Sequence, residues 1–195
     1  MFNKEERCLK KKIVFITSCS NSHNALPEIA ISKKKMKKTY KILYSALKKF
    51  PEYKLVVKGR KGWEMNNLPK LMAGQENYEI EFIKDISPIK LLSNAEIVII
   101  HVTTMALDAL CLDKPVISIW FKDMDYFAGL EKGKGLKTVY NSKQLENAIR
   151  KCKIQTKENT MERKKYLEKE LFKLDGKSSE RIANFINKLI KEKRK

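Results

Sequence analysis

Two polar side chains stand out on a helix-length segment that is otherwise apolar almost all round. The segment from Thr104 to Leu112 reads TMALDALCL, and Thr104 and Asp108 lie four residues apart, which places them on one face of a helix. The first N–H groups of a helix have no partner within it. Together with the hydroxyls of Thr103 and Thr104 and the positive end of the helix dipole, they can bind a diphosphate. Asp108, an acceptor-only carboxylate, suits a vicinal diol such as that of a ribose.

The same residues have a simpler interpretation, in which Thr103 caps the helix and Asp108 faces solvent or favours the dipole. The pattern alone does not decide between the two. His101 ends the preceding apolar run and offers a general base or an imidazole that contacts phosphate. A core histidine that binds a backbone carbonyl is the preferred interpretation of His101.

Polar residues also follow two other apolar runs. Lys58 and Arg60 lie in VVKGRKGW, whose glycines allow backbone and cations to approach a ligand closely. These cations can neutralise charge on a phosphate leaving group, although an ordinary basic loop explains them almost as well. Ser18 and Ser20 lie in a small polar loop after the first run, and we expect them to line the same pocket.

Several other kinds of site are not indicated. The glycine spacings of a P-loop or of a dinucleotide-binding turn do not occur. The D-x-D match at Asp123 and Asp125, a spacing used by metal-dependent sugar transferases, is attributed to chance. Four cysteines without C-x-x-C spacing and two histidines favour neither a zinc site nor disulfides. No metal and no cofactor is therefore expected.

Strand-length apolar runs, rich in Ile and Val, alternate with helical patterns along the chain. The runs are 13–17, 53–57, 78–83, 96–100, 115–120 and 136–140. The clearest amphipathic helix follows Ser32 as its N-cap and ends before Pro51. Because the apolar strands lack a period of two, they predict a parallel sheet that is covered on both faces. The predicted fold class is α/β: a single doubly wound, Rossmann-like domain of about six mainly parallel strands, with a C-terminal helical tail.

The length of 195 residues suits one hydrophobic core. Residues 1–152 are predicted to form the Rossmann-like domain, and residues 153–195 to form helices that pack on it. Hydrophobic residues at 43% and charged residues at 33% are typical of a globular protein, and no apolar run approaches the roughly 20 residues of a membrane span. The charged N-terminus lacks the apolar region of a secretory signal, so a cytoplasmic location is expected.

The net charge is +19, with lysine clusters at 10–12, 33–38, 58–61 and 191–195. Charge of this sign attracts nucleic acid, an anionic membrane surface or phosphorylated substrates. An ordinary lysine-rich surface explains it as well. Since no arginine forks or interleaved aromatic residues accompany the lysines, base readout and stacking are not favoured, and nucleic acid is not an expected partner.

The order helix, strand, threonine-rich elbow, helix and K-P-V-I strand resembles the C-terminal, nucleotide-sugar-binding half of two-domain GT-B-type glycosyltransferases. The residues that carry the resemblance are AEIVI at 95–99, HVTTMALDAL at 101–110, KPVI at 114–117 and the ending DGKSSERIA at 175–183. The capsule-polysaccharide and CDP-glycerol glycerophosphotransferase enzymes are most similar, and UDP-GlcNAc 2-epimerases share the fold. The family usually has Glu where Asp108 stands, Gly where Asp113 stands, and a histidine near positions 58–61 that this chain lacks.

The resemblance implies the donor-binding half of a transferase that uses a nucleotide sugar or CDP-polyol donor in surface-polysaccharide or glycolipid assembly. It assigns the diphosphate to Thr103 and Thr104, the ribose to Asp108 and the leaving-group charge to Lys58 or Arg60, while the catalytic residues stay unknown. The family's acceptor domain has no counterpart in the chain. The implied partners are therefore a polypeptide that supplies that domain and, given the basic surface, an anionic membrane contacted peripherally at its inner face.

Two alternatives stay open. One is a noncatalytic basic module that binds an anionic membrane or nucleic acid. An epimerase comes third, because it would need both domains and acid/base groups that the sequence does not indicate.

Overall fold

The computed structural model describes residues 10–17, 32–59, 63–72, 78–101, 103–121, 136–152 and 157–193. The described strands are β1 (Lys11–Ile16), β2 (Tyr53–Lys58), β3 (Ile80–Ile83), β4 (Ile97–Ile100), β5 (Val116–Ile119) and β6 (Lys137–Val139). The described helices are α1 (Lys33–Leu47), α2 (Trp63–Leu71), α3 (Pro88–Ser93), α4 (Met105–Cys111), α5 (Ser142–Cys152), α6 (Lys157–Leu171) and α7 (Ser178–Lys193).

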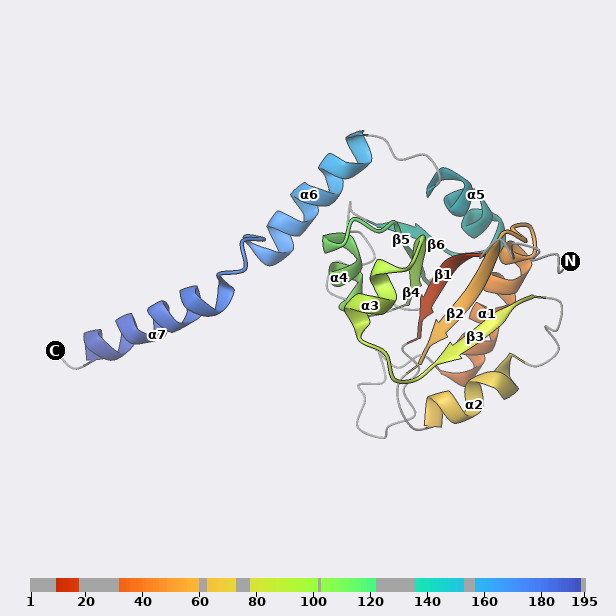
Figure 1. Ribbon diagram of the computed structural model, residues 1–195, viewed down its shortest axis with the longest axis horizontal. Helices are drawn as coiled ribbons and strands as arrows, with labels where there is room; N and C mark the ends of the chain where they lie inside the picture. Colours follow the sequence, from red (N-terminus) through yellow and green to blue (C-terminus); the bar gives the residue numbers. More distant parts are fainter. Residues whose placement is uncertain are drawn as a thin grey trace, which may run out of the picture.

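The six strands form one sheet in the order β3-β2-β1-β4-β5-β6, and every pairing is parallel (Figure 1). The order runs outward in one direction from β1 and in the other from β4, so the topological switch point lies between these two strands. The predicted fold class, a doubly wound parallel sheet with helices around it, is confirmed.

Both faces of the sheet are buried, which explains why the strand sequences lack a period of two. Alternate residues of β1 face opposite sides: Ile13 and Phe15 join the cluster under α1 and α5, whereas Val14 and Ile16 join the cluster under α3, α4 and α6. All four are at most 3% exposed. The two clusters pack on opposite faces of the sheet, so the residues accessible to a ligand lie at the ends of the strands.

Helix α1 begins where its sequence predicts and ends at Leu47, earlier than the predicted end at Pro51. The Ser32 hydroxyl accepts a hydrogen bond from the Lys35 N–H at 3.2 Å, as an N-cap does. The buried face carries Met36, Tyr40 and Leu43, all at most 1% exposed, and the lysines lie on the opposite face. Helix α2, in contrast, was not predicted, because its sequence WEMNNLPKL contains Pro69 and two adjacent asparagines.

The end of α4 is tied to α6. Asp113 has a φ of +56°, and the N–H groups of Asp113 and Lys114 donate to the carbonyls of Leu110 and Ala109 at 3.0 and 2.9 Å, the bonding pattern of a Schellman motif. The Arg163 guanidinium of α6 then binds the Asp113 carboxylate at 2.6 Å. Asp113 thus occupies the left-handed backbone position that glycine usually takes, and its carboxylate forms an ion pair with Arg163 there.

The two C-terminal helices differ in how they meet the domain. Helix α6 packs on α4 through Tyr166 and Leu167, which are 7% and 4% exposed. Helix α7 has no buried residue in the described part of the chain and extends away from the sheet (Figure 1). Helix α6 therefore contacts the domain, whereas no residue of α7 is buried, and the predicted division of the chain at residue 152 stays a prediction. Phe172 and Gly176, at φ of +63° and +70°, lie in the connection before α7. None of the described helices combines the length and apolar character that crossing a membrane requires.

Candidate functional site

The strand register brings Lys58 and the end of β4 to one edge of the sheet. Ile16 of β1 pairs with Lys58 of β2 on one side and with Ile100 of β4 on the other. Lys58 therefore lies level with Ile100, at the end of β4 where the chain continues to His101 and to the elbow at Thr103 and Thr104. This is the carboxyl edge at the switch point, where parallel α/β sheets place their ligands.

At the elbow, Thr103 rather than Thr104 caps α4. The Thr103 hydroxyl accepts from the Met105 N–H at 3.3 Å, and the Thr103 carbonyl accepts from the Ala106 N–H at 3.2 Å. Thr104 already has a helical backbone, with φ −66° and ψ −16°, and its side chain makes no capping bond. The capping interpretation thus holds for Thr103, and the exposed Thr104 hydroxyl is not used by the helix.

Thr104 and Asp108 are both exposed, whereas their neighbours Ala106 and Ala109 are buried. The spacing of four residues places the hydroxyl and the carboxylate on the same face of α4. The helix has only seven residues and is held in place by its apolar faces and by the Asp113–Arg163 pair at its far end. The side chains of Thr104 and Asp108 are thus exposed to solvent on a helix whose position is fixed by its packing.

His101 lies beneath this elbow and is 1% exposed. Its Nδ1 is 2.8 Å from the Ile119 carbonyl oxygen, and its Nε2 is 2.6 Å from the Thr39 hydroxyl. Burial lowers the pKa of His101 to about 4, so the ring is neutral at neutral pH. Since a carbonyl can only accept, Nδ1 of the neutral ring carries the proton. The Thr39 hydroxyl has one proton and two acceptors within reach, Nε2 of His101 at 2.6 Å and the Lys35 carbonyl at 3.0 Å, and the shorter distance favours donation to Nε2.

Both ring nitrogens are therefore engaged inside the core, and His101 offers no donor to a ligand in this arrangement. The ring also contacts Phe15 and Phe121, with centroids 5.7 and 5.8 Å away. This is the core histidine bound to a backbone carbonyl that the sequence favoured. His101 connects α1, β4 and β5 directly under the site and so positions the elbow.

The structure adds Thr39 to the residues that matter for the site, since its hydroxyl is the partner of His101. The sequence did carry a signal for it. Thr39 lies three residues after Met36 and four before Leu43, on the apolar face of an otherwise lysine-rich helix, and it is fully buried. A hydroxyl at such a position must find a partner inside the fold.

Lys58 extends along the edge rather than away from it. Its ammonium donates to the Gly59 carbonyl at 3.1 Å and to the Lys84 carbonyl at 2.9 Å, so it links the ends of β2 and β3. These bonds use two of the three ammonium donors. Contact with an anion would take the third donor or a change of rotamer. Arg60, Ser18, Ser20, Asp123 and Asp125 lie outside the described residues.

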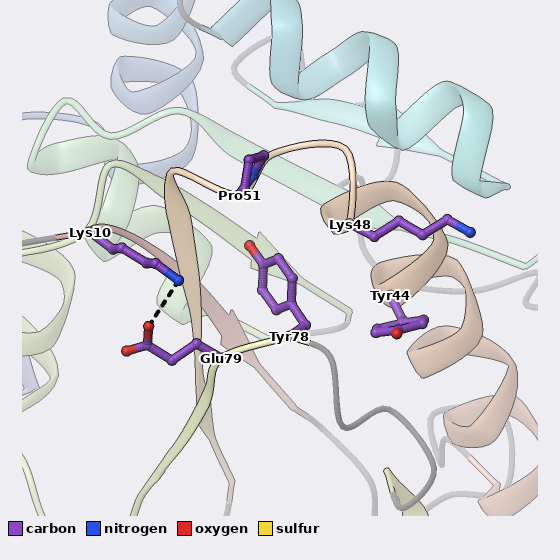
Figure 2. A pocket seen from close by; sticks show the side chains of 6 residues that line it. All are labelled: Lys10, Tyr44, Lys48, Pro51, Tyr78 and Glu79. Atoms are coloured by element: carbon purple, nitrogen blue, oxygen red, sulfur yellow. Dashed lines mark ion pairs between the residues drawn. The ribbon is translucent and has the colours of Figure 1, made fainter.

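A pocket of about 470 Å³ lies at the opposite, amino edge of the sheet (Figure 2). Its lining residues are Lys10, Tyr44, Lys48, Pro51, Tyr78 and Glu79. Lys10 forms an ion pair with Glu79 at 3.2 Å, and the Tyr78 hydroxyl donates to the Phe50 carbonyl at 3.4 Å. Burial raises the pKa of Tyr78. With one lysine neutralised and one phenol engaged, this pocket is less suited to a phosphate than the carboxyl edge.

Among the described residues, no group of three or more His, Cys, Asp or Glu side chains is placed to hold a metal ion. The described residues at the carboxyl edge offer hydroxyl, carboxylate, ammonium and backbone N–H groups. These groups bind and orient an anionic, hydroxylated ligand.

Comparison with solved structures identifies the fold. The chain is similar to the UDP-bound structure of MnaA from S. aureus, with 18% identity and a TM-score of 0.64 over 93% of this chain and 47% of that one. It is also similar to UDP-GlcNAc 2-epimerase from Neisseria meningitidis bound to UDP-GlcNAc (15% identity, TM-score 0.53, 79% and 39%). A third similar structure is WaaG, a glycosyltransferase involved in lipopolysaccharide biosynthesis (11% identity, TM-score 0.55, 91% and 47%).

The chain spans less than half the length of each of these three structures. Its fold is that of one Rossmann-like half of GT-B-type proteins. No protein-family model matches the sequence, and no curated protein matches it either.

Proposed function

We propose that the chain is the donor-binding half of a GT-B-type transferase, which uses a nucleotide-activated sugar or polyol phosphate in surface-polysaccharide or glycolipid assembly. The observation that carries this proposal is the Thr104 and Asp108 pair, exposed on a helix that is otherwise largely packed, at the switch-point edge of the sheet. The similarity to structures that hold UDP or UDP-GlcNAc supports it.

In the proposed complex the diphosphate lies at the elbow, where the Thr104 hydroxyl and nearby backbone N–H groups can donate to its oxygens. Asp108, one turn further, accepts from a ribose diol. A cation from the 58–61 loop takes up charge that develops on the leaving phosphate. The net charge of +19 favours encounter with such an anion.

The proposal also includes a partner polypeptide. This partner would supply the second half of the enzyme, which binds the acceptor and contributes the catalytic base. The chain spans less than half of each of the compared structures. Peripheral contact with an anionic membrane is also proposed, because the chain has a net charge of +19 and anionic surfaces attract clustered lysines.

Calorimetric titration tests the donor site. The ligands are UDP, CDP, UDP-GlcNAc and CDP-glycerol, and the variants are Thr104→Val and Asp108→Asn, which preserve side-chain shape. Each should weaken binding of a good ligand by roughly tenfold or more, since a hydrogen bond to a charged group contributes about 1.5–3 kcal/mol. Glu162→Gln on α6 removes an exposed carboxylate away from the edge and should leave affinity unchanged.

The outcome separates the proposal from its alternative. A noncatalytic basic module would ignore nucleotide sugars and bind oligonucleotides or acidic vesicles with an affinity that falls steeply with salt. The donor-site proposal fails if none of the four ligands binds the wild-type chain, or if both variants bind as the wild type does.

A further inference from the structure

The positive charge of the chain is unevenly divided between the two faces of the sheet. Helices α1 and α5 cover one face, and α3, α4 and α6 cover the other. Positions 33–49, which span α1 and its C-terminal end, contain eight lysines and no Asp or Glu, and α5 contains three Lys or Arg residues and one Glu. By contrast, α6 contains five Lys or Arg residues and four Glu residues, and α3 and α4 together contain one Lys and one Asp. An evenly lysine-rich surface would not produce this difference.

Four of the lysines form a stripe along the outer side of α1. They recur at helical spacing, with Ser45 in the longest gap, and all are exposed: Lys34, Lys37, Lys41 and Lys48. The stripe extends for roughly 21 Å along the helix. None of its ammonium groups has an ionic or hydrogen-bonded partner in the part of the chain that the structure describes. By contrast, a lysine of β1 and a lysine of β2 form ion pairs with glutamates at 3.1 and 2.7 Å.

The opposite side of α1 is committed to the core. Met36, Tyr40 and Leu43 are at most 1% exposed, so α1 has no apolar side chains free to insert into lipid. Its outer side can bind a partner only through charge, and the partner must be anionic.

The breadth and composition of this surface indicate which anionic partner it fits. Helices α1 and α5 pack side by side, so the basic surface is wider than one helix and suits a planar partner. The stripe consists of lysines and one serine. It has neither the arginine forks that read bases nor the aromatic rings that stack on them, and this favours lipid over nucleic acid.

From these observations we propose that the outer side of α1, with α5 beside it, binds the surface of an anionic lipid bilayer through the lysine stripe. Anionic headgroups attract clustered lysines, and the attraction falls off within a Debye length. The N-terminal half of α1 lies at the carboxyl edge of the sheet, where Thr39 contacts His101 beneath the elbow. A bilayer along α1 would therefore lie close to the donor site. This locates the membrane contact of the proposed function on one face and rests on that function for its role, although the binding itself needs no nucleotide.

The test is co-sedimentation of the wild-type chain, without nucleotide, with two kinds of vesicle: phosphatidylcholine alone, and phosphatidylcholine mixed with phosphatidylglycerol in equal parts. The variant Lys37→Gln/Lys41→Gln/Lys48→Gln removes three charges from the stripe. It should bind the mixed vesicles at least roughly tenfold more weakly than the wild type does, because each lysine near an anionic bilayer adds to the affinity.

The matched control is Lys90→Gln/Lys164→Gln/Lys165→Gln, which removes three exposed lysines of α3 and α6 on the other face. The two variants have equal net charge. The control should bind within about threefold of the wild type, because its lysines lie beyond the reach of the lipid charges. Since all six side chains are exposed, the urea midpoints of both variants should match that of the wild type.

Equal weakening by the two variants would overturn the proposal, because net charge rather than one face would then govern binding. Equal wild-type binding to the two kinds of vesicle would overturn it too, as would binding to mixed vesicles that persists in about 1 M salt, where the Debye length is about 3 Å. Tighter binding to a DNA duplex than to mixed vesicles, lost only in the stripe variant, would assign the face to nucleic acid instead.

Calorimetry with UDP keeps this result apart from the donor site. A chain that binds mixed vesicles through the stripe but binds no nucleotide would retain the surface and refute the donor site. A chain that binds UDP but not the vesicles would refute the surface alone.

Discussion

The buried His101 makes the stability of this protein depend on pH in a calculable way. Its pKa falls from 6.5 to about 4 on folding because the ring is buried. Between these values the unfolded chain binds a proton that the folded chain does not. The stabilisation from a neutral His101 is therefore present above pH 6.5 and is lost progressively as the pH falls towards 4. At about 1.4 kcal/mol for each tenfold change in proton affinity, the loss amounts to about 3 kcal/mol.

The measurement is urea unfolding of the wild type and of His101→Gln at several pH values between 7 and 4. Glutamine keeps a donor and an acceptor near Ile119 and Thr39 but does not titrate. The variant should be less stable at pH 7, and the difference between the two proteins should shrink by about 3 kcal/mol at pH 4. The 23 Asp and Glu residues titrate in both proteins, so their effect cancels in that difference.

A wild-type minus His101→Gln difference that stays constant from pH 7 to 4 would refute the assignment of a neutral, buried His101, and with it the proton placement on Nδ1.

Three further predictions concern single side chains. Burial raises the pKa of Cys152 to about 11, so at pH 8 iodoacetamide should modify this thiol far more slowly in the folded chain than in urea. Peptide mass spectrometry measures the two rates, and equal rates would contradict the prediction. Asn141→Ala removes the acceptor of the Gln144 N–H bond at 2.9 Å and should lower the unfolding free energy by about 1 kcal/mol, whereas Asn141→Ser should lose little. Asp113→Ala should destabilise the fold by about 1–3 kcal/mol, since it leaves the guanidinium of Arg163 without its carboxylate. Asp113→Gly should cost less than Asp113→Ala because glycine adopts the left-handed backbone without strain, and the reverse order in urea midpoints would refute this.

The sheet was predictable because its signal is local. Runs such as Ile97–Ile100 are apolar on both faces, and Ser32 and Pro51 bracket α1 in the sequence itself. Such runs and caps need no knowledge of the rest of the chain. Helix α2 was not predicted because it lacks such a local signal: WEMNNLPKL has neither a clear apolar stripe nor a cap. Its buried Leu68 joins the core through contacts that are distant in sequence.

The parts that resisted prediction depend on non-local contacts. His101 stands at a strand end, where a ligand contact is a reasonable expectation, but Thr39, 62 residues away, occupies its Nε2. The amphipathic stripes of α5 and α7 are alike in sequence. Leu145 and Ile149 of α5 are buried against α1, whereas the stripe of α7 has no such neighbour, and periodicity alone cannot tell a covered face from an open one.

At the carboxyl edge, different residues are expected to determine the stability of the fold and the affinity for the donor, so the two effects can be measured separately. Thr39 and His101 lie in the core and fix the elbow from below, while Thr104 and Asp108 stand in solvent above it. Thr39→Val leaves the buried Nε2 without its donor and should cost about 1–3 kcal/mol of unfolding free energy. Thr104→Val and Asp108→Asn should leave that free energy nearly unchanged. If the exposed pair binds the donor, its variants will lose affinity at constant stability. Unaltered affinity in those stable variants would mean that the exposed pair does not bind the donor.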